Sequence, residues 1–132
     1  MEPAGLDQIP LFAKLTADER AEVAACLREV NVEPGTPLAR QGDWAYELFV
    51  IESGEAEVRK GGEVVMTLGA GDVFGEIGLL ATGTRTATVV ATSRMRLAAM
   101  FLQDFKRLEA RMPALADALR ETMAEHVGQS SL

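Results

Sequence analysis

The residues best suited to chemistry lie in one segment, GAGDVFGEIGLLATGTRTATVVATS, which covers residues 69–93. A short helical turn is predicted at about 76–80, after a strand end and several glycines. The first N–H groups of a helix have no partner within the helix, and the positive end of its dipole attracts anions. The amides of Gly75, Glu76 and Ile77 therefore predict an anion site.

A single arginine is placed to complete this site. Arg85 follows Glu76 by nine residues, so its side chain can fold back over Gly75, and its planar fork suits two oxygens of one phosphate. A carboxylate beside a phosphate is unfavourable unless a neutral donor, such as a ribose hydroxyl, binds it. The set predicts a site for a compact phosphorylated sugar. A surface ion pair between Glu76 and Arg85, with ordinary turn glycines, would explain the same residues.

Length and charge limit the remaining possibilities. A chain of 132 residues, 48% apolar and 25% charged, predicts one globular domain over residues 1–132. The net charge of −7 argues against binding to nucleic acid or to an anionic membrane, since both require clustered Lys and Arg. Any anionic ligand must therefore be held by a local arrangement of groups.

Cysteine and histidine are too rare for several kinds of site. Cys26 is the only cysteine and His126 the only histidine, so an internal disulfide, a thiolate cage and a multi-histidine metal site are all excluded. We expect no metal and no cofactor. The first thirty residues show no signal-peptide pattern, and no apolar run approaches the roughly 18 residues of a membrane span. The sequence predicts a cytoplasmic protein.

The N-terminal part predicts an amphipathic helix over about 16–29. Thr16 and Glu19 have the spacing of a capping box, in which each side chain accepts from the other residue's backbone N–H. Four residues recur at helical spacing on one face: Val23, Cys26, Leu27 and Val30. Cys26 is therefore expected to be a core residue rather than a reactive thiol.

Short apolar runs separated by glycines predict strands from about 31 to 100. Residues 48–51 are apolar on both faces, as in an inner strand, whereas 55–59 alternate like a half-exposed strand. Gly61-Gly62 predicts a hairpin between that strand and residues 63–68. Strands without long intervening helices favour a barrel or roll over a parallel α/β sheet.

The C-terminal part predicts two helices separated near Met112-Pro113. Residues 101–108 form one amphipathic stretch, and Pro113 is expected to begin the second helix. Three apolar residues recur along that helix: Leu115, Leu119 and Met123. Their stripe could pair two copies in a homodimer or pack on its own roll. The predicted fold is mainly β, with one helix before the roll and a helix pair after it.

The 69–93 segment resembles the cyclic nucleotide-binding domain family, whose members include the catabolite activator protein and the regulatory subunits of protein kinase A. FGEIGLL followed by RTATV is similar to the family's phosphate-binding cassette. PGTPLARQGDWAYELFVIESGEAEV is similar to its first strands. The resemblance covers about residues 9–127 and implies an antiparallel double-stranded β-helix, or jelly roll.

The resemblance also implies roles for individual residues. Glu76 would accept from the ribose 2′-hydroxyl, Arg85 would bind the cyclic phosphate, and backbone groups from Gly75 to Ile77 and at Thr86 would complete the cradle. In the family, a threonine at the position of Thr86 occurs both in members that tolerate cyclic GMP and in members that bind cyclic AMP. Thr86 therefore does not decide which base is bound. The residues expected beside the nucleotide are Phe74, Val58 and Val65, with His126 or Ser130 from the end of the chain over the base. Without the resemblance, His126 would be interpreted as a solvated residue at the end of a helix.

The expected function is that of a sensor. The sequence predicts a non-enzymatic domain that binds cyclic AMP, with cyclic GMP as the other candidate ligand, and regulates an unknown effector protein in trans. One alternative is an interaction module that keeps this fold without binding a nucleotide. Another is a metal-dependent enzyme on a similar roll, which a single histidine makes unfavourable.

Overall fold

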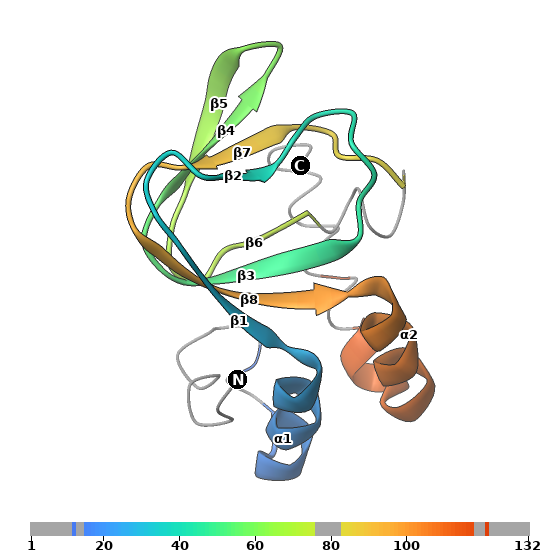
Figure 1. The fold of residues 1–132 in the computed structure, drawn as a ribbon. Coiled ribbons are helices and arrows are strands. Elements are labelled where there is room, and N and C mark those ends of the chain that lie inside the picture. The colour runs from blue at the N-terminus through green and yellow to red at the C-terminus, as the bar shows by residue number, and fades with distance from the viewer. Residues whose placement is uncertain (1–11, 13–14, 76–82, 118–120, 122–132) are drawn as a thin grey trace.

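The computed structural model describes residues 12, 15–75, 83–117 and 121. Two four-stranded antiparallel sheets form a roll, in the orders β1-β8-β3-β6 and β2-β7-β4-β5. Figure 1 shows α1 and α2 on the outside of the first sheet, away from the second. The elements are α1 (Ala17–Cys26), β1 (Arg28–Val32), β2 (Pro37–Ala39), β3 (Glu47–Ser53), β4 (Ala56–Lys60), β5 (Glu63–Leu68), β6 (Val73–Phe74), β7 (Thr88–Ala91), β8 (Met95–Phe101) and α2 (Leu102–Arg111).

This arrangement confirms the predicted fold class, a mainly β roll with flanking helices. None of the helices among the described residues is long and apolar enough to cross a membrane.

The first helix begins as predicted and ends earlier than predicted. The Thr16 side chain accepts from the Glu19 N–H at 3.2 Å, and the Glu19 carboxylate accepts from the Thr16 N–H at 2.9 Å, which confirms the capping box. The expected helix over 16–29 is wrong at its end, because α1 stops at Cys26 and Leu27 is extended. Val30 lies in β1 opposite Leu97, where a β-branched residue packs well on a pleated sheet.

The alternation of β3 and β8 builds two separate cores. One face of the sheet packs against the helices, through Leu48 and Val50 of β3 and through Phe105 of α2. The other face points into the roll, through Phe49 and Ile51, where strands of the second sheet cover it. The expectation that residues 48–51 are buried on both faces is therefore confirmed, because successive side chains of a strand point to opposite sides.

The predicted hairpin forms between β4 and β5. Gly61 and Gly62 make the turn, both with positive φ, and Lys60 pairs with Glu63 across it. Ala56 and Val58 of β4 are fully buried, as the alternation of 55–59 predicts. In Figure 1 the hairpin stands at the end of the roll farthest from the helices.

The C-terminal part follows the prediction with one shift. Phe101 ends β8 and α2 begins at Leu102, where the sequence predicted a helix from 101. α2 ends at Arg111, Met112 caps it, and residues 113–117 are helical again. Leu115 is buried in the core between the helices and the sheet, so this member of the stripe packs on its own roll. Leu119 and Met123 lie outside the described residues.

Gly54 joins β3 to β4 in a conformation that other residues rarely adopt. Its φ is +95°, and a Cβ there would lie 2.4 Å from the Arg94 carbonyl oxygen and 2.9 Å from the Met95 Cα. Both of these are backbone atoms, and moving them would disturb the start of β8, so the clash with an added Cβ would not be relieved easily.

We expect Gly54→Ala to lower the free energy of unfolding by more than about 2 kcal/mol, because strain in the left-handed region and a backbone clash add. Gly35→Ala is the control, since its φ is +88° with nothing within 4 Å of the added carbon. Chemical denaturation of both variants measures the difference. Equal losses in the two proteins would show that the contact with the 94–95 backbone is not tight.

Glu52 on β3 is a carboxylate in an unfavourable position. Its Oε2 atom is buried and has no hydrogen-bond partner within the described part of the chain. Burial raises the pKa of Glu52, the nearby Glu29 carboxylate raises it further, and Arg96 partly offsets both. Arg96 forms its ion pair with Glu29, at 3.3 Å, and acts on Glu52 only as a nearby positive charge.

A raised pKa means that the folded state binds the Glu52 proton more tightly than the unfolded state does. The resulting stabilisation is present at low pH and is lost as the pH rises through the raised pKa. Glu52→Gln should therefore stabilise the fold at pH 7, by less than about 1 kcal/mol because solvent screens the half-exposed side chain. The gain should vanish below about pH 4. Urea denaturation at pH 7 and at pH 4 measures the free energy of unfolding of Glu52→Gln and of the control Glu55→Gln, whose side chain is exposed. A stabilisation by Glu52→Gln at pH 4 equal to that at pH 7 would contradict this expectation.

Candidate functional site

The site is centred on Arg85, the one buried charged side chain among the described residues, with 8% of its surface exposed. Its Nη2 donates to the Glu47 carbonyl oxygen at 2.8 Å, and its Nη1 donates to the Gly75 carbonyl oxygen at 3.2 Å. A buried guanidinium is costly unless its N–H groups find acceptors. The two carbonyls supply such acceptors and fix the plane of the guanidinium.

The backbone of Arg85 is held as firmly as its side chain. The Arg85 N–H donates to the Asp43 carbonyl at 2.8 Å, and the Gly42 N–H donates to the Arg85 carbonyl at 2.9 Å. The Ala45 N–H donates to the Gly83 carbonyl at 3.0 Å. The loop before β3 thus pairs with the segment before β7, which places Arg85 beside the starts of both strands.

Gly75 lies directly after β6 and contacts the arginine. Its φ is +85°, and a Cβ there would lie 2.4 Å from the Arg85 Nη1 and 3.2 Å from the Glu47 carbonyl oxygen. The close neighbours in the structure are the guanidinium of Arg85 and the start of β3.

The Phe49 ring lies beside Arg85 on the inner side of the roll, and the Phe74 ring stacks on it. Phe49 of β3 pairs in register with Phe74 of β6, and their rings stack with centroids 5.0 Å apart and an interplanar angle of 20°. The Cζ atom of Arg85 lies over the Phe49 ring, 5.8 Å from its centroid. Both rings are buried.

The other predicted site residues lie at different depths. Thr86 follows Arg85 and is half-buried. Val58 is fully buried in the same core cluster as Phe74. Val65 lies on β5 with 48% of its surface exposed, outside that cluster. Phe74, Gly75 and Arg85 are thus brought together, Val58 lies deeper in the roll, and Val65 lies at its surface.

Four predicted site residues, Glu76, Ile77, His126 and Ser130, lie outside the described residues. So does the helical turn expected at 76–80. Their assignment as ligand contacts stays a prediction from the sequence.

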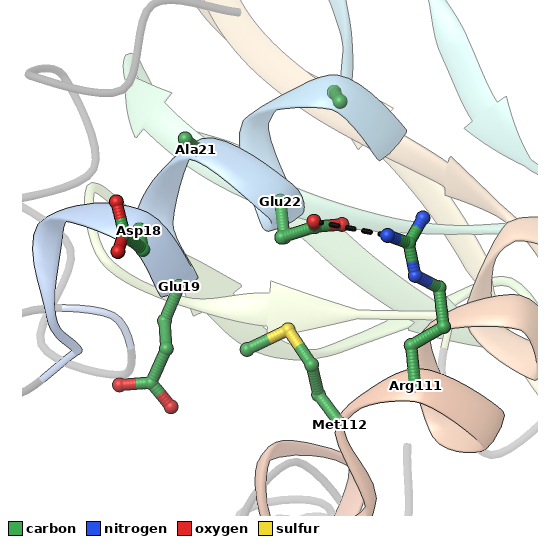
Figure 2. Close-up of a pocket in the computed structure, with 7 residues that line it drawn as sticks. Asp18, Glu19, Ala21, Glu22, Arg111 and Met112 are labelled. Atoms are coloured by element: carbon green, nitrogen blue, oxygen red, sulfur yellow. Dashed lines mark hydrogen bonds and ion pairs between the residues drawn. The ribbon is translucent and has the colours of Figure 1, made fainter.

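A separate cavity of about 640 Å³ lies between α1 and the end of α2 (Figure 2). Asp18, Glu19 and Glu22 line it from α1, and Arg111 donates to the Glu22 carboxylate across it at 3.2 Å. Three carboxylates against one paired guanidinium disfavour an anionic ligand. None of the predicted ligand residues lines this cavity, so it is distinct from the site at Arg85.

A metal centre is not evident in the described part of the chain, where no group of three or more His, Cys, Asp or Glu residues could hold an ion. Cys26 is half-buried against the core of the helices, as expected for a packing residue, and burial raises the pKa of its thiol.

A family model now identifies the chain. The model described as the cyclic nucleotide-binding domain matches residues 29–111, which is more than half of the sequence. The chain therefore belongs to the cyclic nucleotide-binding domain family, as the 69–93 segment indicated.

Individual relatives agree with this assignment. The chain is 40% identical over 104 residues to a cAMP-dependent protein kinase regulatory subunit of Schizosaccharomyces pombe, a match that covers 78% of this chain and 25% of that protein. It spans about a quarter of the length of such relatives.

Solved structures show the same fold. The regulatory domain of PKA from Toxoplasma gondii, in a co-crystal structure with cAMP, is similar with a TM-score of 0.78 and 29% identity, covering 93% of this chain and 48% of that one. The Thermus thermophilus catabolite activator protein is similar with a TM-score of 0.80 and 30% identity, covering 92% and 60%. These similarities confirm the jelly-roll fold expected from the sequence.

Sequence reasoning missed the groups that hold Arg85. Glu47 and Asp43 act through their backbone carbonyls, which every residue possesses, so no side-chain pattern could reveal them. Phe49 had one usable signal, because it lies in the apolar run 48–51 on the face that points into the roll.

We expect Gly75→Ala to displace the Arg85 guanidinium, because the methyl group would occupy its present place. The loss of stability should exceed about 2 kcal/mol, because the hydrogen bonds of a buried guanidinium are lost in addition to the left-handed strain. Gly83→Ala is the matched control, with φ +78° and nothing within 4 Å of the added carbon.

Crystal structures and thermal unfolding of both variants check this expectation. A larger loss of stability in Gly75→Ala than in Gly83→Ala, with Arg85 moved only in Gly75→Ala, would support it. Arg85 found in place in both variants would contradict it.

Proposed function

We propose that this chain is a sensor that binds cyclic AMP at Arg85 and regulates a separate effector protein, without catalysing a reaction itself. The observation that carries the proposal is the buried guanidinium of Arg85, held by the carbonyl of Glu47 at the start of β3 and the carbonyl of Gly75 just after β6. The family membership and the sequence RTATV around this arginine support the assignment.

The ligand's charge fits the site better than it fits the protein as a whole. A cyclic phosphate carries one negative charge, which a single guanidinium balances through two parallel hydrogen bonds. The net charge of −7 disfavours anions in general, so recognition depends on the local arrangement. We assign the ribose 2′-hydroxyl to the carboxylate of Glu76, the phosphate cradle to the backbone of residues 75–77, and the base to the end of the chain that contains His126.

The start of α2 is connected to the site through two consecutive carbonyls, that of Tyr46 just before β3 and that of Glu47 at its first residue. The Glu47 carbonyl holds Arg85, and the Tyr46 carbonyl accepts from the N–H of Leu102, the first residue of α2, at 3.2 Å. Binding of the phosphate to Arg85 would therefore act on the Glu47 carbonyl, which lies one peptide away from the carbonyl that anchors α2.

The far end of α2 provides a hinge. The Met112 N–H donates to the Leu108 carbonyl at 2.7 Å, while the Met112 carbonyl accepts from Leu115 and Ala116 at 3.1 Å each. One residue thus ends α2 and begins the helical residues 113–117. We propose that these two helical segments change their relative angle when the ligand binds, which requires that the ligand have different affinities for the two arrangements.

A thermal-shift series with cyclic AMP and cyclic GMP separates the sensor from a module that keeps the fold without a ligand. A ligand that binds only the folded state stabilises it by about 2.7 kcal/mol at a hundred times its Kd. The sensor requires a rise in melting temperature with at least one nucleotide, and the larger rise identifies the base preference. No rise with either would favour the interaction module.

We expect Arg85→Leu to weaken cyclic AMP binding by about 2–5 kcal/mol, the range for removing one partner of a buried charge pair. Glu76→Gln should cost less, because an amide oxygen still accepts from a hydroxyl. Arg94→Leu is the control, since it removes the same charge from a side chain that is 80% exposed.

Calorimetric titration of the three variants with cyclic AMP measures the affinity that each one loses relative to the wild type. Unchanged affinity in Arg85→Leu would overturn the assignment of the phosphate site. A larger loss in Glu76→Gln than in Arg85→Leu would overturn the role given to Glu76.

A further inference from the structure

Phe49 is the buried side chain over which the Arg85 guanidinium lies. It occupies the centre of β3, with Ala99 of β8 opposite it on one side and Phe74 of β6 on the other. These pairings fix its backbone, and the stack on Phe74 at 5.0 Å fixes the plane of its ring. The ring therefore has one orientation in the folded roll.

The guanidinium meets this ring in a buried setting. Arg85 Cζ lies 5.8 Å from the ring centroid, within the range in which the negative face of an aromatic ring attracts a cation. Such attraction strengthens when water is excluded, and both side chains are less than one-tenth exposed. An aliphatic residue would fill the same space without attracting the charge.

We infer that Phe49 is a positioning residue for Arg85: its ring, together with the Gly75 and Glu47 carbonyls, holds the guanidinium in its binding position before the phosphate arrives. This inference rests on the proposed function. The carbonyls fix the direction of two N–H groups, and the ring holds the plane of the cation from the side. A ligand then finds the arginine already ordered, and the apparent affinity is not reduced by the fraction of molecules with Arg85 elsewhere.

The test replaces Phe49 by ring-fluorinated phenylalanines carrying an increasing number of fluorine atoms. Fluorine withdraws electron density from the face of the ring and nearly preserves its shape, so packing is kept while attraction to the cation is lost. We expect cyclic AMP affinity to fall stepwise, by about 3- to 30-fold at full fluorination. Phe49→Leu should show a loss of similar size.

Ile51→Val is the control for core packing, because Ile51 is fully buried on the same strand and faces the same core as Phe49. It should leave the affinity unchanged. A flat fluorine series in a protein that binds cyclic AMP would overturn the inference, even if Phe49→Leu binds weakly, because packing alone would then explain the loss.

A second readout needs no ligand. Side-chain NMR relaxation at the Arg85 Nε–H group in the ligand-free protein should show low mobility in the wild type and in Ile51→Val. It should show higher mobility in Phe49→Leu and in the fully fluorinated protein. Unchanged mobility would overturn the inference. If the wild type bound neither cyclic AMP nor cyclic GMP, the proposed function would fail, and this measurement alone would decide the role of Phe49.

Discussion

Two backbone carbonyls, one at the start of β3 and one just after β6, hold the guanidinium of Arg85. Both belong to the sheet that carries the helices, whereas Arg85 comes from the segment that leads into β7 of the other sheet. The arginine therefore joins the two sheets where β3 and β7 begin. A buried charge in this position requires that both carbonyls, the Phe49 ring and the loop at Asp43 stay in place.

β3 connects the Arg85 site to the helices, because one of its faces packs inside the roll and the other packs against the helices. Phe49 points into the roll toward the site, and Leu48 and Val50 point toward the helices. The Tyr46 carbonyl, just before β3, accepts from the start of α2, and the Glu47 carbonyl, at the first residue of β3, accepts from Arg85. A protein interior is close-packed and transmits small displacements. The same strand can thus carry a change at the site to the helices without a separate relay.

Local patterns in the sequence predicted the elements they determine. The capping box at Thr16 and Glu19, the turn at Gly61-Gly62 and the buried run 48–51 all depend on neighbouring residues, and all are present in the structure. The end of α1 was wrong because the pairing of β1 with β8, nearly seventy residues away, decides it. The partners of Arg85 were missed for the same reason, since Glu47 is 38 residues distant and contributes a carbonyl.

The most direct test of the account is a crystal structure of this chain grown with cyclic AMP. We expect the cyclic phosphate within hydrogen-bond distance of the Arg85 guanidinium, with the Arg85 side chain still lying over the Phe49 ring. A nucleotide bound elsewhere, such as between α1 and α2, or an Arg85 side chain turned into solvent with the ligand present, would contradict it.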